Sequence, residues 1–217
     1  MKKIILTASG GPFFGKTEDE LRNVTVKEAL NHPNWSMGAK ITIDSASMMN
    51  KGLEIIEAAW LFDMSPDDID VVVHRESIIH SMIEFTDNSV LAQLGLPDMR
   101  IPIQYAITYP HRFESPVEAL DFRKISSMTF YEPDYKTFKC LSACKRAIAR
   151  GGIIPAVANG ANEVANKLFR ENKISFLQIG ELVSSAVDSF EYKEIRTLED
   201  VLDADRAARE YVLNLAK

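Results

Sequence analysis

The chain has 217 residues, 46% of them hydrophobic and 26% charged, which is enough apolar material for a buried core and excludes a disulfide-dependent miniprotein or a wholly disordered chain. Lys and Arg number 25 and Asp and Glu number 31, so the net charge is −6 and non-specific nucleic-acid binding is not expected. No apolar run approaches the ~18 residues that span a membrane. The apolar stretch Ile4–Leu6 is also too short for the core of a signal peptide.

The only two cysteines, Cys140 and Cys144, are four residues apart in a stretch with helical periodicity. Both then fall on one face of one helix, where a disulfide would constrain nothing, and no further metal ligands lie near them. We therefore expect two buried, small apolar side chains and a protein of the reducing cytoplasm, or of the plastid if the source were a plant.

The first half of the chain mixes predicted strands with one long helix. The helix is expected from about Ser45 to Phe62. Strands are expected at residues 4–8, 40–44, 70–74, 79–85 and 90–94, with the last two joined by a turn at residues 86–89. Residues 1–108 are therefore predicted to form an α/β (α+β-like) domain, a mixed sheet with packed helices.

The second half of the sequence predicts helices without strands, after a segment rich in prolines. Residues 109–136 are punctuated by prolines but keep recurring apolar side chains, which predicts a connecting segment that crosses the fold. Four helices are expected after it, at residues 138–150, 155–170, 176–190 and 198–215. Short loops between them predict a helical bundle over residues 137–217.

The predicted helix after residue 44 carries a polar stripe. Ser47, Asn50, Lys51 and Glu54 follow the spacing i, i+3, i+4 and i+7, which places them on one face. From periodicity alone, a solvent-facing side of an amphipathic helix is the preferred interpretation. However, the stripe is narrow and begins at Ser45, on the expected strand-to-helix turn, where free backbone N–H groups favour an anion. The alternative is therefore a site for a phosphorylated substrate.

Other candidate segments are individually weak. Ser9, Gly10 and Gly11 follow the first predicted strand and allow either a tight turn or an anion contact. The loop His32–Gly38 contains an imidazole, an indole and a thioether, and is equally consistent with a structural loop and with a lid over a ligand. His74 and His80 are treated as structural. No GxGxxG motif follows any predicted strand, so no dinucleotide site is assigned.

Five strings occur in an order that identifies a family. They are SGGPF (9–13), HPNWSMG (32–38), KITIDSASMMNKGLE (40–54), SIIHSM (77–82) and LGLPDMR (94–100), and ANGANEVA (158–165) follows in the helical part. Together they closely resemble the 1-deoxy-D-xylulose 5-phosphate reductoisomerase family. The resemblance extends over essentially the whole chain but covers only the catalytic and C-terminal helical regions of the family.

The resemblance implies roles for individual residues, and it reverses the preference for a solvent-facing stripe. Substrate contacts would come from Ser9, His32, Ser45, Asn50, Lys51 and Glu54. Glu54 would be a metal ligand and Gly38 would lie beside the nicotinamide cofactor. Trp35 and Met37 would belong to a flap near residues 31–39, and Ser77, His80, Pro97 and Met99 would form a second tier around the site.

The resemblance also implies an NADPH- and Mg- or Mn-dependent reductive isomerisation of a small phosphorylated sugar by a homodimer. The family's NADPH-binding domain and two of its three protein metal ligands have no counterpart here. We therefore expect a truncated form that is inactive alone. The alternative is a non-catalytic dimerising or phosphate-binding module derived from the enzyme.

Overall fold

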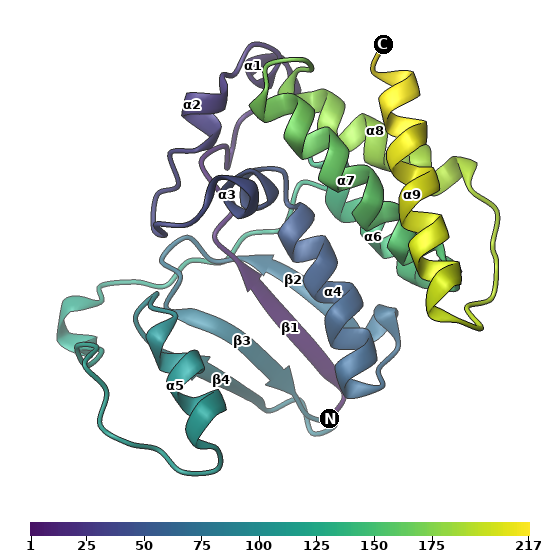
Figure 1. The fold of residues 1–217 in the computed structure, drawn as a ribbon. Coiled ribbons are helices and arrows are strands. Elements are labelled where there is room, and N and C mark those ends of the chain that lie inside the picture. Colours follow the sequence, from purple (N-terminus) through teal and green to yellow (C-terminus); the bar gives the residue numbers. More distant parts are fainter.

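The computed structural model describes all residues from 1 to 217 and joins a four-stranded sheet to a helical bundle (Figure 1). The strands are β1 (Lys3–Ala8), β2 (Ile69–Val73), β3 (Ile79–Glu84) and β4 (Val90–Leu94), in the order β2-β1-β3-β4. β1 pairs parallel with β2 and antiparallel with β3, and β3 pairs antiparallel with β4. The predicted mixed sheet is therefore confirmed.

The segment at residues 40–44, predicted as a strand, is helical, and that prediction was wrong. It belongs to α3 (Ala39–Ala46), which begins at Gly38 and has Thr42 Oγ1 donating to the Gly38 carbonyl at 2.9 Å. The consecutive β-branched residues Ile41, Thr42 and Ile43 imitate a strand, but much of α3 is buried in the fold, and tertiary burial outweighs local propensity. The Lys40–Asp44 ion pair at i, i+4 is the local signal that favoured a helix.

The expected continuous helix from Ser45 to Phe62 is consequently two helices. α3 ends near Ser47, and α4 (Met49–Phe62) begins after Met48, which has a left-handed backbone with φ of 61°. Ser47 is therefore not on the polar stripe of α4. It is buried, and its hydroxyl donates to the carbonyl of Asp44.

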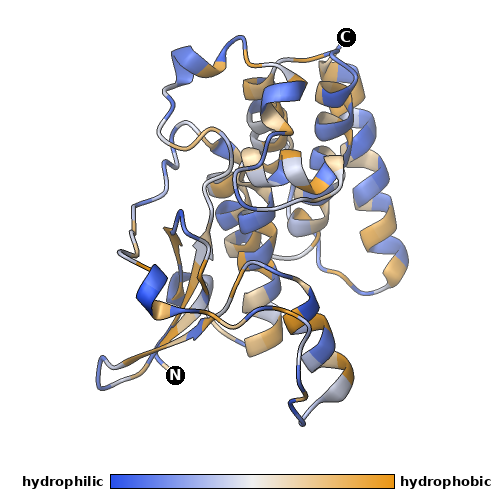
Figure 2. Ribbon diagram, turned by 90° about the vertical axis from the view of Figure 1, so that its left-hand side faces the viewer, coloured by the Kyte–Doolittle hydropathy of each residue, from blue (hydrophilic) through white to orange (hydrophobic).

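Helices α6 (Lys139–Arg150), α7 (Ile154–Arg170), α8 (Phe176–Ser189) and α9 (Leu198–Leu215) form the bundle, within a residue or two of the prediction. In Figure 2 these helices carry both orange and blue segments, as expected for helices with one face packed inside. The bundle and the sheet share one continuous hydrophobic core. No helix in the chain is both long enough and apolar enough to cross a membrane.

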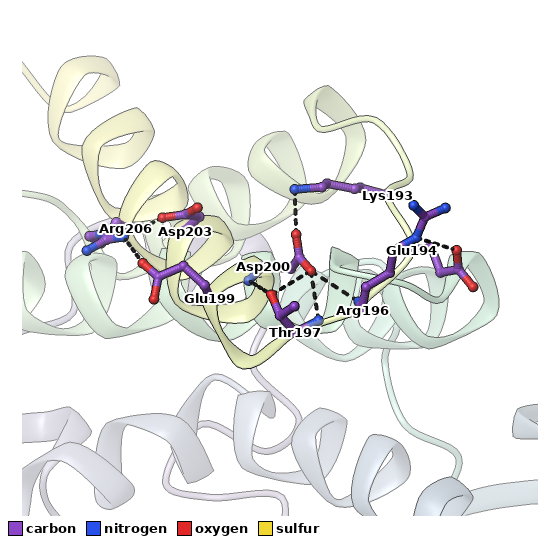
Figure 3. A network of polar contacts seen from close by, with 8 residues as sticks. All are labelled: Lys193, Glu194, Arg196, Thr197, Glu199, Asp200, Asp203 and Arg206. Carbon is purple, nitrogen blue, oxygen red and sulfur yellow. Dashed lines mark hydrogen bonds and ion pairs between the residues drawn. The ribbon is translucent and has the colours of Figure 1, made fainter.

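The loop into α9 is held by polar contacts (Figure 3). Asp200 accepts hydrogen bonds from the backbone N–H groups of Arg196 and Thr197 and forms an ion pair with Lys193 at 2.6 Å. These contacts lower the pKa of Asp200 below its usual value, led by the Lys193 contact. This surface network fixes the start of α9.

The remaining elements are short or were not predicted. α5 (Arg100–Thr108) follows the sheet, and η2 (Phe122–Lys124) lies in the connecting segment. The others are α1 (Glu18–Leu21), α2 (Val26–Ala29) and η1 (Pro66–Asp68). Thr17 and Thr25 cap α1 and α2 with reciprocal hydrogen bonds from Glu20 and Glu28, which is why such short helices form.

Both cysteines are free and buried, as expected from their spacing. Burial raises the pKa of Cys140 to about 12 and also raises the pKa of Cys144, so neither is a thiolate at neutral pH. Their helix, α6, packs directly on α4. The contact is so close that a Cβ atom added at Gly52 of α4 would lie 2.7 Å from both Cβ and Sγ of Cys144.

Replacing Gly52 with Ala should therefore destabilise the fold. We expect the free energy of unfolding to fall by about 1–3 kcal/mol, the usual cost of overpacking. Gly180→Ala is the matched control, since it gains the same helix propensity and its nearest neighbour is the Cβ of Lys139 at 3.1 Å. Urea unfolding measures both, and equal values for the two variants would contradict the close contact.

Candidate functional site

A cavity of about 760 Å³ opens where the end of β1, the start of α4 and the edge of the sheet meet. Its floor includes Thr7, Ala8 and Ile79 of the sheet. The loop at residues 32–37 and the segment at residues 96–102 also line it. A cavity of this size is ample for a small phosphorylated metabolite.

The glycine turn after β1 brings the first polar group to this cavity. Gly10 and Gly11 have φ of 77° and 65°, a conformation that glycine adopts without strain. A Cβ atom on Gly11 would lie 2.9 Å from Cα of Ala46 and 3.1 Å from the carbonyl oxygen of Ser45. The turn can therefore press against the end of α3, and Ser9 comes close to Ser45.

His32 joins these two serines. Its Nε2 lies 2.9 Å from the Ser9 hydroxyl and 3.1 Å from the Ser45 hydroxyl. Its Nδ1 accepts hydrogen bonds from the backbone N–H groups of Asn34 and Trp35 at 3.1 and 3.0 Å. Because Nδ1 is an acceptor, the neutral ring carries its proton on Nε2 and shares it between the serines.

The pKa of His32 is lowered by burial and, to a smaller extent, by the positive charge of Arg75. Protonation would also place a hydrogen on Nδ1, against the two backbone donors. Both effects favour the neutral imidazole at physiological pH.

The first turns of α4 supply the next group of polar side chains. Lys51 is only 9% exposed and donates to Oε2 of Glu54, while Asn50 Nδ2 donates to Oε1 of the same carboxylate at 2.7 Å. No side chain caps the start of α4. A buried ammonium beside an uncapped helix start is a favourable environment for an anion.

Most of the residues expected at the site do line this cavity. They are Ser9, His32, Trp35, Met37, Ser45, Asn50, Lys51, Glu54, Ser77, His80 and Met99. Gly38 and Pro97 do not line it: Gly38 is exposed at the start of α3, and Pro97 lies between Leu96 and Asp98, which do line the cavity. Ser45 lies in the last turn of α3, so its expected place at a helix N-terminus was wrong.

The two histidines of the sheet region differ in their surroundings. His74 is fully buried, stacks on Phe130 and has Nδ1 3.0 Å from the carbonyl of Thr129, as expected of a structural histidine. His80 meets the edge of Trp35 with ring centroids 6.3 Å apart, and Nε2 lies 3.2 Å from the carbonyl of Gly95. Burial lowers the pKa of His80.

Two further residues hold the flap and the glycine turn together, and the sequence did not indicate either role. Asn34 Nδ2 donates to the carbonyl of Arg75 at 2.6 Å and to the hydroxyl of Ser77 at 2.9 Å. The guanidinium of Arg75 donates to the carbonyls of Ser9 and Gly11. Only the position of Asn34 inside the HPNWSMG string pointed towards the site.

The cavity also contains Tyr105 and Arg112, from parts of the chain to which no function was assigned. The guanidinium of Arg112 lies over the ring of Tyr105, 4.0 Å from its centroid. No local pattern around either residue distinguishes it from an ordinary surface side chain.

Comparison with known families places this geometry in context. Residues 1–62 match the 1-deoxy-D-xylulose 5-phosphate reductoisomerase C-terminal domain, and residues 94–211 match the DXP reductoisomerase C-terminal domain. The chain therefore belongs to the 1-deoxy-D-xylulose 5-phosphate reductoisomerase family, as the sequence motifs indicated.

Individual relatives agree with this assignment. The 1-deoxy-D-xylulose 5-phosphate reductoisomerase of Acetivibrio thermocellus is 55% identical over 215 residues, covering 99% of this chain and 56% of the relative. The protein of the same name from Chloroherpeton thalassium is 56% identical over 214 residues, covering 99% of this chain and 55% of the relative. The chain thus spans about half the length of these relatives.

Solved structures show the same fold. A DOX-P reductoisomerase crystallised with NADPH, fosmidomycin and magnesium superimposes with a TM-score of 0.94 at 43% identity, covering 100% of this chain and 55% of the other. The Zymomonas mobilis enzyme in complex with NADPH gives a TM-score of 0.92 at 44% identity, covering 100% and 56%.

The lowered pKa of His32 predicts a loss of stability in mild acid. As pH falls below about 6.5, the unfolded chain takes up a proton at His32 before the folded chain does, so the free energy of unfolding decreases. His32→Gln keeps a hydrogen-bond donor for the serines but cannot titrate. The free energy of unfolding of this variant should therefore fall less between neutral and mildly acidic pH. Urea unfolding at about pH 7.5 and about pH 5.5 measures it.

His111→Gln, at an exposed position, is the control for that measurement and should behave like the original protein. His80, whose pKa is also lowered, continues to contribute in both variants. An unchanged pH dependence in His32→Gln would show that His32 is not held neutral by the fold.

Proposed function

We propose that this chain forms the substrate-binding wall of a 1-deoxy-D-xylulose 5-phosphate reductoisomerase. The complete reaction converts 1-deoxy-D-xylulose 5-phosphate to 2-C-methyl-D-erythritol 4-phosphate, in isoprenoid biosynthesis, with NADPH and a divalent metal. The observation that carries the proposal is that Ser9, Ser45, Asn50 and Lys51 all line the same cavity.

These side chains suit a phosphate group. Two hydroxyls, an amide and an ammonium provide hydrogen-bond donors, and the Lys51 ammonium adds the charge. His32 Nε2 already bonds to both serine hydroxyls, so the donors are oriented before an anion arrives. Binding energy from a phosphate, remote from the reacting carbons, would help to position them.

The segment at residues 31–39 would act as the flap. His32 contacts the serines, while Trp35 and Met37 place an indole and a thioether over the cavity. The hydrogen bonds from Asn34 to the turn at residues 75–77 would hold this segment closed and exclude water from the reacting groups. Ser77, His80, Pro97 and Met99 would form the second tier around the substrate.

The residues present do not by themselves fit the divalent metal. Glu54 is the proposed ligand, but Asn50 and Lys51 engage both of its oxygens. Mg prefers about six oxygen ligands, and no group of three or more His, Cys, Asp or Glu side chains in this structure could hold a metal. We assign Glu54 as one ligand and derive no step of the reaction through the metal.

The cofactor, partners and domain boundaries belong to the same proposal. Gly38, exposed within the flap, would lie next to the nicotinamide of NADPH. The chain would act in the cytoplasm as a homodimer, and the exposed Leu91 on the free edge strand β4 supports an interface there.

The proposed catalytic domain comprises residues 1–108. A connecting segment at residues 109–136 would join it to the helical domain at residues 137–217.

Removing the ammonium of Lys51 tests the phosphate site. Lys51→Met keeps the aliphatic stem, and we expect its affinity for inorganic phosphate to fall about tenfold or more, because a hydrogen bond to a charged group contributes about 1.5–3 kcal/mol. Isothermal titration calorimetry gives the affinity. Lys167→Met, on an exposed part of α7, is the control, and equal affinities in the two variants would argue against the site.

Whether this chain alone turns over substrate tests the conclusion that its metal-ligand set is incomplete. We expect no oxidation of NADPH when the purified chain is mixed with 1-deoxy-D-xylulose 5-phosphate and Mg, because one carboxylate is a poor ligand set. Absorbance of NADPH follows the reaction, with the full-length Acetivibrio thermocellus relative as the positive control. Sustained turnover by the chain would disprove its expected inactivity.

A further inference from the structure

Two buried asparagines of the bundle have no place in the site described above. Asn162 and Asn166 lie one turn apart on α7, within and just after the ANGANEVA string, and both are fully buried. Their side-chain amides donate to the same carboxylate oxygen, Oδ1 of Asp44, at 2.9 and 2.8 Å. Asp44 is only 2% exposed and belongs to α3, so these bonds cross from the bundle to the helix that carries Ser45.

The remaining polar atoms around Asp44 strengthen the link. Lys40 Nζ lies 2.8 Å from the second carboxylate oxygen of Asp44 and 2.7 Å from Glu163 of α7. Asn166 also donates to the carbonyl of Lys40 at 3.0 Å, and Arg170 donates to Asn166 Oδ1 at 2.8 Å. The Arg170 contact fixes which end of the Asn166 amide faces Asp44, because only the amide nitrogen can donate to a carboxylate.

This arrangement is not the most stabilising way to fill the space between two helices. Asn162 Oδ1 is buried without any hydrogen-bond partner, which costs free energy. Apolar side chains of similar volume often stabilise such an interface as well or better. The amide–carboxylate hydrogen bonds are directional, so they fix the rotation of α3 about its axis and its position along that axis relative to α7.

The periodicity of α3 connects that orientation to the cavity. Lys40 and Asp44, four residues apart, face α7, while Ile41 and Ser45, each one residue further on, line the cavity. Successive residues of a helix are separated by about 100° around its axis. A rotation or slide of α3 that breaks the Asp44 contacts therefore also moves Ser45 away from His32 and Ser9.

We propose that Asn162 and Asn166 are positioning residues for the anion site, acting through Asp44 to fix Ser45. The proposal rests on the proposed function for the identity of the ligand, but the geometry it describes exists without a ligand. Figure 1 shows α3 beside α7 and close to the end of β1, where such a link can hold Ser45 in place.

The central experiment replaces Asn166 with Asp, which keeps the shape of the side chain and sets a second carboxylate against Asp44. We expect the affinity for inorganic phosphate to fall about tenfold, the scale of one lost hydrogen bond to a charged group. We also expect the ring-nitrogen NMR signals of His32 to shift without phosphate, because its Ser45 partner moves. His32→Gln assigns those signals among the four histidines.

Two further variants separate positioning from general destabilisation. Val183→Ala removes buried apolar atoms from α8, which supplies none of the contacts around Asp44, and should lower stability while leaving phosphate affinity and the His32 signals unchanged. The double variant Asp44→Asn, Asn166→Asp restores an amide–carboxylate pair with the partners exchanged. It should return both readings towards those of the original protein.

The outcomes distinguish this inference from the proposed function. Unchanged His32 signals in Asn166→Asp, or a double variant as impaired as the single one, would overturn the positioning role. If Asn166→Asp does not fold, Asn162→Ala, which removes one of the two amide donors, gives the same readings. If the original protein binds no phosphate, the proposed function fails, and the His32 signals alone decide the positioning role.

Discussion

The backbone of Gly11 lies against the end of α3 so closely that no side chain could stand between them, and the rest of the site depends on this contact. A Cβ atom there would be 2.9 Å from Cα of Ala46. The left-handed backbone at Gly10 and Gly11 makes the approach possible. Ser9 and Ser45 are thereby brought within reach of a single imidazole, so one turn of backbone determines where three polar side chains meet.

The electrostatics of the cavity follow from this compact arrangement. His32 remains neutral because burial and the backbone donors at Nδ1 both oppose its protonation, and it can therefore orient hydroxyls without adding charge. The positive charge comes from Lys51, which is buried but paired with Glu54. An anion would thus meet an ammonium already held in place, at little cost in side-chain entropy.

Much of the fold could be predicted from sequence, and the exceptions have physical reasons. The strands of the sheet and the four bundle helices follow their apolar periodicity, and most of the site residues that the resemblance to the family indicated do line the cavity. Helix α3 was missed because its consecutive β-branched residues, Ile41 to Ile43, match a strand and outweighed the Lys40–Asp44 spacing, and because its burial comes from distant segments. Asn34 and Arg75 were missed because their partners are brought close only by the folded chain.

The proposed division into a catalytic domain and a helical domain is therefore less sharp in energetic terms than along the sequence. The hydrophobic core is continuous between them, but apolar packing alone would permit small shifts of one helix against another. The contacts of Asn162 and Asn166 with Asp44 remove that freedom for α3. The residue that follows Asp44 in this helix, Ser45, lines the cavity. A directional contact is most useful where a small displacement would change chemistry, which accounts for a buried carboxylate in an interface that apolar side chains could have filled.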